Sequence, residues 1–400
     1  MINLFPNKIF QLKPSSLSFL RTAAGQMASP AFILDQKQYP DSQNVIHYMK
    51  KGLLLWWLVL WPFLTPAQKY ANAFLDIGVD AASIGAGSNV TATIDNVNAI
   101  YWNPAGLMRM DGNYLSLMHA RYFGGMASMN FLGYAVSKDR QRLGLALFRL
   151  GVDNIMNTTR LIDENGDVDY NRITYFSAAD YALMAGYARD FLDNRLHAGL
   201  TAKLIYRHIG DFADGYGFGF DLGAQYDLGK WQTGLVLRDV TTTFSYWHFN
   251  KERLDEIAAA SPGHNQTTPS STELRYPSLT AGIARRFTVK NDYHLLAALD
   301  LHTWFVQRHA LVNSAYFSMS PGLSLTADYK EIVYLRLGTD RIYHSYLYGT
   351  KVWHVRPAAG IGLRFKYLQL DYALTDNAAS GKYSHVFSFI INTRIFKSRK

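Results

Sequence analysis

Residues 196–207 read LHAGLTAKLIYR, and side chains of opposite character alternate along most of this segment. Successive side chains of a β-strand point to opposite faces, so Leu200 and Leu204 share one face while Lys203 and Arg207 share the other. The same two-faced pattern recurs at 218–227 and 368–375. A long series of strands with charges on one face suits a barrel whose outside meets lipid and whose inside meets water.

The composition agrees with such a barrel. The chain has 400 residues, of which 48% are hydrophobic, and its mean hydropathy is -0.09. A helical membrane protein needs runs of about 20 apolar residues, whereas in a membrane barrel only every second residue faces lipid. The 26 tyrosines and 23 phenylalanines suit aromatic girdles at the two interfaces. Composition alone also allows an aromatic-rich soluble β protein.

The segment 49–67 has the pattern of a signal peptide: Met49 and two lysines, a short apolar run, and a small residue before Gln68. We therefore expect residues 1–48 to be an upstream extension from a mis-assigned start. The alternative is a cytoplasmic tail before an anchor helix. Without residues 1–67, which hold six basic and two acidic residues, the formal net charge falls from +9 to +5. The remaining basic residues are scattered, which excludes nucleic acid as an expected partner.

The pattern predicts an all-β fold, a transmembrane antiparallel β-barrel of about fourteen strands within residues 113–396, followed by a tail at 397–400. The predicted strands are 114–121, 127–137, 142–152, 181–188, 196–208, 217–226, 231–240, 279–287, 294–302, 323–329, 333–339, 359–365, 368–375 and 385–396. Their connections largely alternate between short and long, as periplasmic turns and outer loops do. Residues 68–112 are rich in small side chains and are predicted to fold inside the lumen as a plug. An ordinary loop with a short helix is the alternative.

The sequence contains no pattern typical of a catalytic, metal or cofactor site. The chain has no cysteine, no paired histidines at helical spacing, no nucleophile elbow and no nucleotide fingerprint after a strand. We therefore expect a protein that is not an enzyme. A Ser-His-Asp set assembled in space, as in an outer-membrane hydrolase, stays open as an alternative. Arginines and aspartates on the polar strand faces are expected to form ion-pair ladders in the lumen.

One aromatic cluster is a candidate partner-binding surface. Phe244, Tyr246, Trp247 and Phe249 lie in the predicted loop 241–278, and such a cluster at the outer rim suits a grip on another protein. An extension of the aromatic girdle is the alternative.

The segment before the first strand resembles a known family. FLDIGV at 74–79, SIGAG at 83–87 and the plug motif Trp102, Asn103, Pro104, Ala105 and Gly106 are similar to the start of PorV/PorQ outer-membrane proteins of Bacteroidota, within the wider FadL-like barrels. The resemblance covers residues 74–396. The chain departs from the family in reading Ile84-Gly85-Ala86-Gly87 where Met-Gly-Met-Gly is usual.

This resemblance implies a fourteen-stranded barrel with a lumen plug, a place in the outer membrane lipid, and work in type IX protein secretion. The implied partners are the type IX translocon, the attachment-complex proteins, and the C-terminal signal domains of cargo that the barrel passes to the cell surface. The alternative function is a FadL-like channel for hydrophobic small molecules. A channel requires an apolar tunnel past the plug and a gap in the wall, whereas a cargo shuttle requires a sealed lumen.

Overall fold

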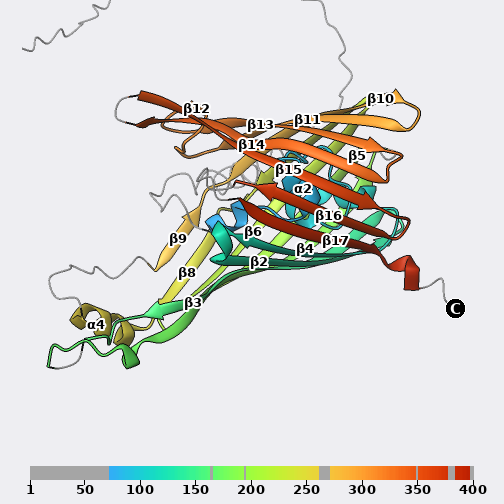
Figure 1. The fold of residues 1–400 in the computed structure, drawn as a ribbon. Helices are drawn as coiled ribbons and strands as arrows, with labels where there is room; N and C mark the ends of the chain where they lie inside the picture. Colours follow the sequence, from blue (N-terminus) through green and yellow to red (C-terminus); the bar gives the residue numbers. More distant parts are fainter. Residues whose placement is uncertain are drawn as a thin grey trace, which may run out of the picture. The chain divides into compact units, whose positions relative to one another are not determined.

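The computed structural model describes residues 72–162, 165–192, 195–260, 271–347, 350–376 and 383–396. The expected upstream extension, the signal peptide at 49–67, the first residues of the plug and the tail at 397–400 lie outside these ranges. Figure 1 shows strands slanting around an interior that holds the short helices of the N-terminal segment. The strands are β1 Tyr114–Tyr122, β2 Ala127–Lys138, β3 Gln141–Asn157, β4 Thr174–Phe191, β5 Leu196–Ile209, β6 Ala213–Leu228, β7 Trp231–Arg238, β8 Thr243–Phe249, β9 Thr272–Arg275, β10 Ser278–Lys290, β11 Tyr293–Trp304, β12 Val312–Asn313, β13 Ser318–Tyr329, β14 Val333–Leu347, β15 Thr350–Arg364, β16 Leu368–Thr375 and β17 Ser384–Asn392.

The helices are short and most lie in the N-terminal segment. Those of 3-10 type are η2 Ala73–Asp76, η3 Pro104–Arg109, η4 Phe123–Gly125, η5 Tyr170–Arg172 and η6 Thr393–Phe396, and the α-helices are α2 Ala81–Gly85, α3 Ala99–Trp102 and α4 Lys251–Ala260. No helix within the described ranges is long and apolar enough to cross a membrane.

The sheet closes on itself because β1 pairs with both β2 and β17. β7 and β8 both pair with β6 and together form one interrupted strand, and β9 and β10 form its interrupted neighbour. β12 is a two-residue addition to β13. The cylinder therefore has fourteen antiparallel strands, as the sequence pattern predicts, and closure leaves no edge unpaired in lipid.

The two faces of the wall match the alternation. On β5, Leu200 and Leu204 are exposed outward at 38% and 61%, while Thr201 and Lys203 are buried toward the interior at 0% and 5%. The same outward apolar row appears on β3 at Leu143, Leu145 and Leu147. On β1–β4 the inward residues are instead apolar and pack against the plug, as Met129, Phe131 and Phe148 do. A closed sheet with an apolar outer face defines the class of protein: a membrane-spanning β-barrel.

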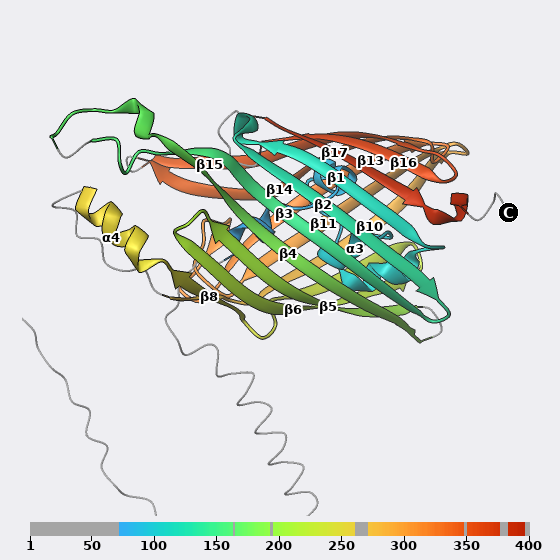
Figure 2. The same ribbon diagram turned by 90° about the horizontal axis from the view of Figure 1, so that it is seen from below.

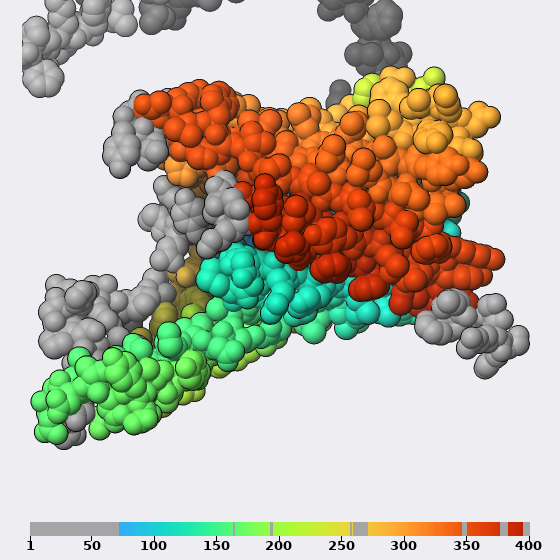
Figure 3. Space-filling view, viewed as in Figure 1, coloured from blue at the N-terminus to red at the C-terminus, as the bar shows by residue number. Residues whose placement is uncertain are grey.

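The predicted strand ranges leave 153–180 and 340–358 as long outer loops, and this prediction was wrong, because much of both segments is strand. β3 and β4 run on as an arm beyond the barrel, shown in green in Figures 1 and 3, and β14 and β15 form a second arm. The physical reason is a β-bulge in each hairpin: the pairing shifts between Val152 and Ile155, where Asn154 has φ 61°, and again between Thr339 and Ile342. A bulge reverses which residues face outward, so the alternation used for prediction stops there.

Residues 241–278, predicted as one loop, likewise contain β8, α4 and β9. The described part of this segment connects to the first arm, because Arg160 forms an ion pair of 2.8 Å with Glu256 of α4. Figure 2 shows α4 beside the end of the β3–β4 arm.

Residues 72–112 form the plug and pack inside the cylinder. Glycines on the inner face of the wall let the backbone of the plug approach the strands. A Cβ atom on Gly199 of β5 would lie 2.5 Å from the carbonyl carbon of Pro104, and one on Gly338 of β14 would lie 2.5 Å from that of Ala86. Gly85 of the plug meets Gly360 of β15 in the same way, with a Cβ-to-Cα distance of 2.8 Å. The plug is therefore held against backbone on several strands.

We expect Gly199→Ala to lower the free energy of unfolding by about 1–3 kcal/mol, because the added methyl group must displace main chain rather than a flexible side chain. The matched control is Gly229→Asn in the turn after β6, where φ is +62° and nothing lies within 4 Å. Asn tolerates that conformation. Urea unfolding in detergent micelles measures both variants, and equal stability of the two would contradict the close packing described here.

Candidate functional site

Residues of the plug motif form hydrogen bonds both within the plug and to the barrel wall. Trp102 donates its indole N–H to the carbonyl of Val79, at 2.9 Å. The side-chain amide of Asn103 donates to the carbonyls of Thr91 and Ala224, at 2.7 and 3.1 Å, and its oxygen accepts from the N–H of Ala105 at 3.2 Å. Asn103 thus joins two parts of the plug to β6 with all of its polar atoms.

The other three motif residues suit their positions sterically. Pro104 begins η3, where its missing N–H costs nothing. Pro104 and Ala105 lie against the bare backbone of Gly199 on β5. Gly106 lies so close to the carbonyl oxygen of Ile94 that a Cβ atom would collide with it. The motif is therefore a packing and hydrogen-bonding element of the plug, with no group placed for catalysis.

A buried ion cluster, which we call the latch, joins the start of the plug to the wall. It consists of Asp76, Lys203, Asp221, Asp239 and Arg275. Lys203 contacts Asp221 and Asp239 at 2.6 and 2.7 Å, Arg275 contacts Asp239 at 2.7 Å, and Arg275 also pairs with Asp76. Burial alone would raise the pKa of the Asp76 carboxyl, but the nearby guanidinium groups, above all Arg275, hold that pKa well below its usual range. Asp76 in the plug therefore stays ionised at neutral pH.

The latch lies at the interruption between β7 and β8, where the connecting segment stays hydrogen-bonded to β6. Between β7 and β8 the chain turns through Asp239 and Thr242, whose φ angles of 54° and 60° are uncommon for residues other than glycine. The backbone N–H of Asp239 donates to the carboxylate of Asp221 at 2.8 Å, and the Thr243 hydroxyl donates to Asp239 at 2.6 Å. Such backbone strain persists only where surrounding contacts determine it. The latch supplies those contacts and fills the break.

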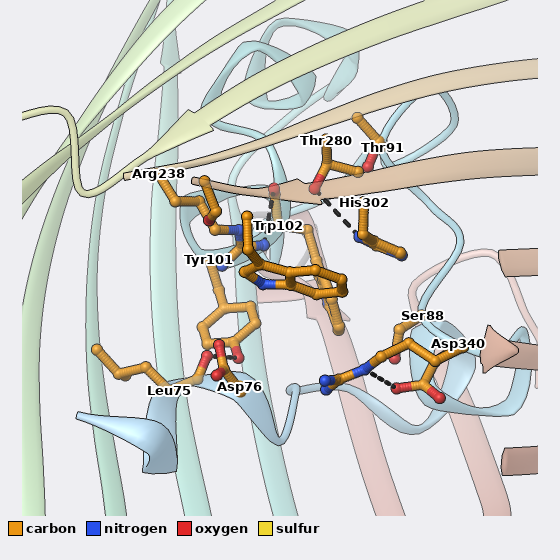
Figure 4. Close-up of a pocket in the computed structure, with 13 residues that line it drawn as sticks. Leu75, Asp76, Ser88, Thr91, Tyr101, Trp102, Arg238, Thr280, His302 and Asp340 are labelled. Carbon is orange, nitrogen blue, oxygen red and sulfur yellow. Dashed lines mark hydrogen bonds and ion pairs between the residues drawn. The ribbon is translucent and has the colours of Figure 1, made fainter. Parts of the chain in front are cut away.

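A small cavity lies between the plug and the wall beside the latch (Figure 4). Its volume is about 70 Å³, and its lining includes the aromatic rings of Tyr101, Trp102 and Trp304. His302 takes part through a hydrogen bond of 3.1 Å with Thr280. A dry cavity of about 150 Å³ is known to hold benzene, so this one is too small for an aromatic ring as it stands.

Four charged side chains line this cavity. Asp76, Asp340 and Arg341 are in ion pairs, and the fourth is Arg238. Its guanidinium lies 5.2 Å from the ring centre of Tyr101 and 5.8 Å from that of Trp102, and it donates to the Trp102 carbonyl at 3.2 Å. Within the described residues no carboxylate forms an ion pair with Arg238. The cavity therefore offers aromatic surface together with a cation that has no anionic partner.

The structure separates the four residues predicted as a partner-binding loop. All four belong to β8, whose alternation turns Phe244 and Tyr246 outward and Trp247 inward. Phe244 stacks on Phe218 of β6 at 5.9 Å, and Trp247 packs under the guanidinium of Arg207 at 4.7 Å. Phe249 stacks on Trp247 at 6.1 Å. The four side chains therefore do not form one surface, and this arrangement suits the girdle alternative for the outward pair.

The expected ion-pair ladder is present in part. Arg336 pairs with Asp371 at 2.8 Å, and Arg286 pairs with Asp328 at 3.0 Å. Asp300 instead accepts from the backbone N–H of Thr91 in the plug, at 3.1 Å. Sequence reasoning missed the latch, although Lys203 and Asp221 both stood out as charges on the polar faces of neighbouring strands.

A serine does lie within reach of a histidine: the Ser345 hydroxyl and the Nε2 atom of His354 are 2.8 Å apart on the β14–β15 arm. No carboxylate of the described residues bonds to the His354 ring to complete a triad, and no group of three or more acidic or histidine side chains there could hold a metal. The pair is a cross-strand contact.

No protein-family profile and no curated protein matches the sequence. Solved structures with a similar fold include the monoaromatic hydrocarbon channel CymD, with 12% identity and TM-score 0.49 over 79% of this chain and 98% of that one. The Pseudomonas putida toluene transporter TodX has 14% identity and TM-score 0.48 over 79% and 98%. A Pseudomonas aeruginosa FadL homologue has 11% identity and TM-score 0.42 over 82% and 99%. These likenesses concern the fold alone.

We expect Asn103→Ala to destabilise the plug by about 1–3 kcal/mol, because the carbonyls of Thr91 and Ala224 each lose a hydrogen bond, although Gln225 still donates to Thr91. Asn103→Asp is the sharper variant: its shape is retained, but a carboxylate faces the carbonyls of Thr91 and Ala224. Limited proteolysis of the N-terminal segment measures the release of the plug. Resistance equal to that of the unmodified protein in both variants would contradict the role given to Asn103.

Proposed function

We propose that this protein is an outer-membrane channel for small hydrophobic molecules, and that the described conformation is its closed state. The observation that carries the proposal is the cavity at the plug, which combines aromatic rings with the guanidinium of Arg238 near the interruption between β7 and β8. Among the described residues no carboxylate forms an ion pair with this guanidinium. Binding sites for small molecules are mainly apolar with few polar groups that fix orientation. The proposal is based on this site, because the structural likenesses are too weak to support it.

The same site suggests what such a molecule looks like. Aromatic surface suits an apolar body, and Arg238 suits an acidic or hydrogen-bond-accepting end. The cavity is too small in the closed state, so passage requires the plug to shift and the latch to open. Weakening the latch is therefore the direct way to test the channel.

The test is uptake of labelled palmitate and labelled toluene by cells that lack the gene and carry a plasmid copy. We expect deletion to lower the uptake of both, and Asp239→Asn, which removes one charge from the latch, to raise both above the unmodified level. Arg238→Met should lower uptake of palmitate several-fold and leave toluene unchanged. Arg140→Gln, in the exposed turn between β2 and β3, is the control.

Heat-modified mobility in gels shows that each variant is folded. Uptake that is unaffected by deletion would refute the channel, and normal palmitate uptake in folded Arg238→Met would refute the role of Arg238.

A second candidate is the cargo-binding role in type IX secretion that the resemblance to PorV/PorQ proteins implies. The observation that favours it is the lumen itself: the plug and charged side chains occupy it, and the cavity at the plug has a volume of only about 70 Å³. Two arms extend beyond the barrel at its long-loop end and offer a surface for another protein. In this case the expected partners are the translocon, the attachment-complex proteins and cargo C-terminal domains.

Affinity purification from detergent-solubilised outer membrane separates the two functions. Recovery of a very large translocon barrel or of proteins sharing a C-terminal signal domain, with fatty-acid uptake unaffected by deletion, would support secretion. Recovery of neither, with uptake lost, would support the channel. The same fractionation tests the proposed outer-membrane location and, by N-terminal sequencing, the proposed cleavage near residue 67.

A further inference from the structure

One side of the barrel wall is lower than the rest. β16, β17 and β1 have 8, 9 and 9 residues, whereas β3 and β4 have 17 and 18. β1 ends at the turn η4, and in Figure 2 this turn lies well short of the outer ends of β4 and β15. The rim at β17, β1 and β2 is therefore a low point of the outer end.

The outward face at this low rim is polar where lipid would be expected. Five side chains form what we call the low-rim patch: His119 and Arg121 of β1, Asn130 of β2, Arg149 of β3 and His385 of β17. Cross-strand pairing brings them together, because Arg121 is opposite His385, His119 is opposite Asn130, and Asn130 is opposite Arg149. The patch is thus continuous over four strands.

Position along the strands shows that the patch is unusual. Arg149 is the ninth residue of β3, and Leu204, exposed to 61%, is the ninth residue of β5. Both strands begin at the short-turn end and both pair with β4, where Arg149 is opposite Tyr181 and Leu204 is opposite Leu183, so the two residues lie at similar height on nearby strands of the wall. Lipid-facing arginine costs about 2–4 kcal/mol at the midplane and little near the interface. The polar layer of the membrane must therefore come down to the patch.

The partners within the patch leave Arg121 free. Arg149 is held by Asp153 at 3.2 Å and by the Tyr181 hydroxyl at 3.3 Å. His119 bonds to the Asn130 side-chain oxygen at 2.8 Å, and His385 bonds to the Tyr372 hydroxyl at 2.8 Å. Within the described residues Arg121 has no hydrogen-bond or ion-pair partner and is exposed.

We propose that the low-rim patch binds the phosphate of an outer-leaflet lipid headgroup. Arg121 supplies a fork of donors suited to phosphate oxygens, and the amide nitrogen of Asn130 supplies another. Among the described residues, Asp153 is the carboxylate that contacts the patch, and it is paired with Arg149. Charge complementarity therefore favours an anionic headgroup, and the short strands allow that headgroup to reach the patch.

Native mass spectrometry of the detergent-solubilised full chain tests this inference. We expect phosphatidic acid to be retained in preference to diacylglycerol, which lacks the phosphate. Arg121→Gln should lower retention of phosphatidic acid about fivefold, since one arginine near an anionic lipid surface contributes about that factor. Arg172→Gln, an exposed arginine on the β3–β4 arm, is the matched control and should retain phosphatidic acid as the unmodified protein does.

Equal retention of phosphatidic acid and diacylglycerol, or no loss in folded Arg121→Gln, would overturn the proposal. A photo-crosslinking residue at position 121 in living cells provides a second measurement: a lipid adduct supports the inference, and a protein adduct in its place shows a protein docking face instead. The patch lies on the outside of the wall, away from the latch, so these outcomes are independent of the uptake experiments.

Discussion

Direct contact between the backbone of the plug and the backbone of the wall is the constraint on which this structure depends. The interior of a fourteen-stranded cylinder is too wide for side chains of the wall alone to fill. Here the chain fills it with its own residues 72–112, and glycines at Gly199, Gly338 and Gly360 let main chain meet main chain. Because glycine has no side chain, the backbone of the plug occupies the space that a side chain would take at these positions.

Close approach also accounts for the polar character of the interior. The backbone groups of the plug are short of partners, because its helices have only 4–6 residues. Wall side chains supply the partners: Thr201 donates to the carbonyl of Ile100 at 2.8 Å, and Gln225 donates to the carbonyls of Thr91 and Ile94 at 3.1 and 3.2 Å. Buried charges are then paired in the latch, where loss of one partner would leave the others uncompensated.

Much of the fold could be predicted from the sequence, because lipid outside and water or plug inside impose a period of two on every strand. The prediction was wrong where that period is interrupted. Asn154 adopts φ 61° within a bulge, so β3 continues past the point where the alternation ends. The break between β7 and β8 has the same effect and caused β8 to be taken for loop.

The candidate site was less accessible to sequence reasoning. The plug motif is contiguous and could be singled out, whereas the latch joins Asp76 to residues on β5, β6, β9 and the β7–β8 break, and only the closed cylinder brings them together. Arg238 appeared as one of several arginines on polar faces, and nothing in its own segment distinguishes a residue without a carboxylate partner. The aromatic residues of β8 were predicted to form one surface because they are close in sequence. On a strand, neighbouring residues lie on opposite faces.

The position of the plug in the chain has a consequence for biogenesis. The plug is made before any strand, and β1, which follows it, must meet β17, the last strand, to complete the cylinder. Ser388 of β17 donates to Asp80 of the plug at 2.9 Å, so the last strand that completes the cylinder is also in contact with the plug. The cylinder therefore cannot reach its final set of contacts without enclosing the plug, so closure of the barrel and burial of the plug are coupled.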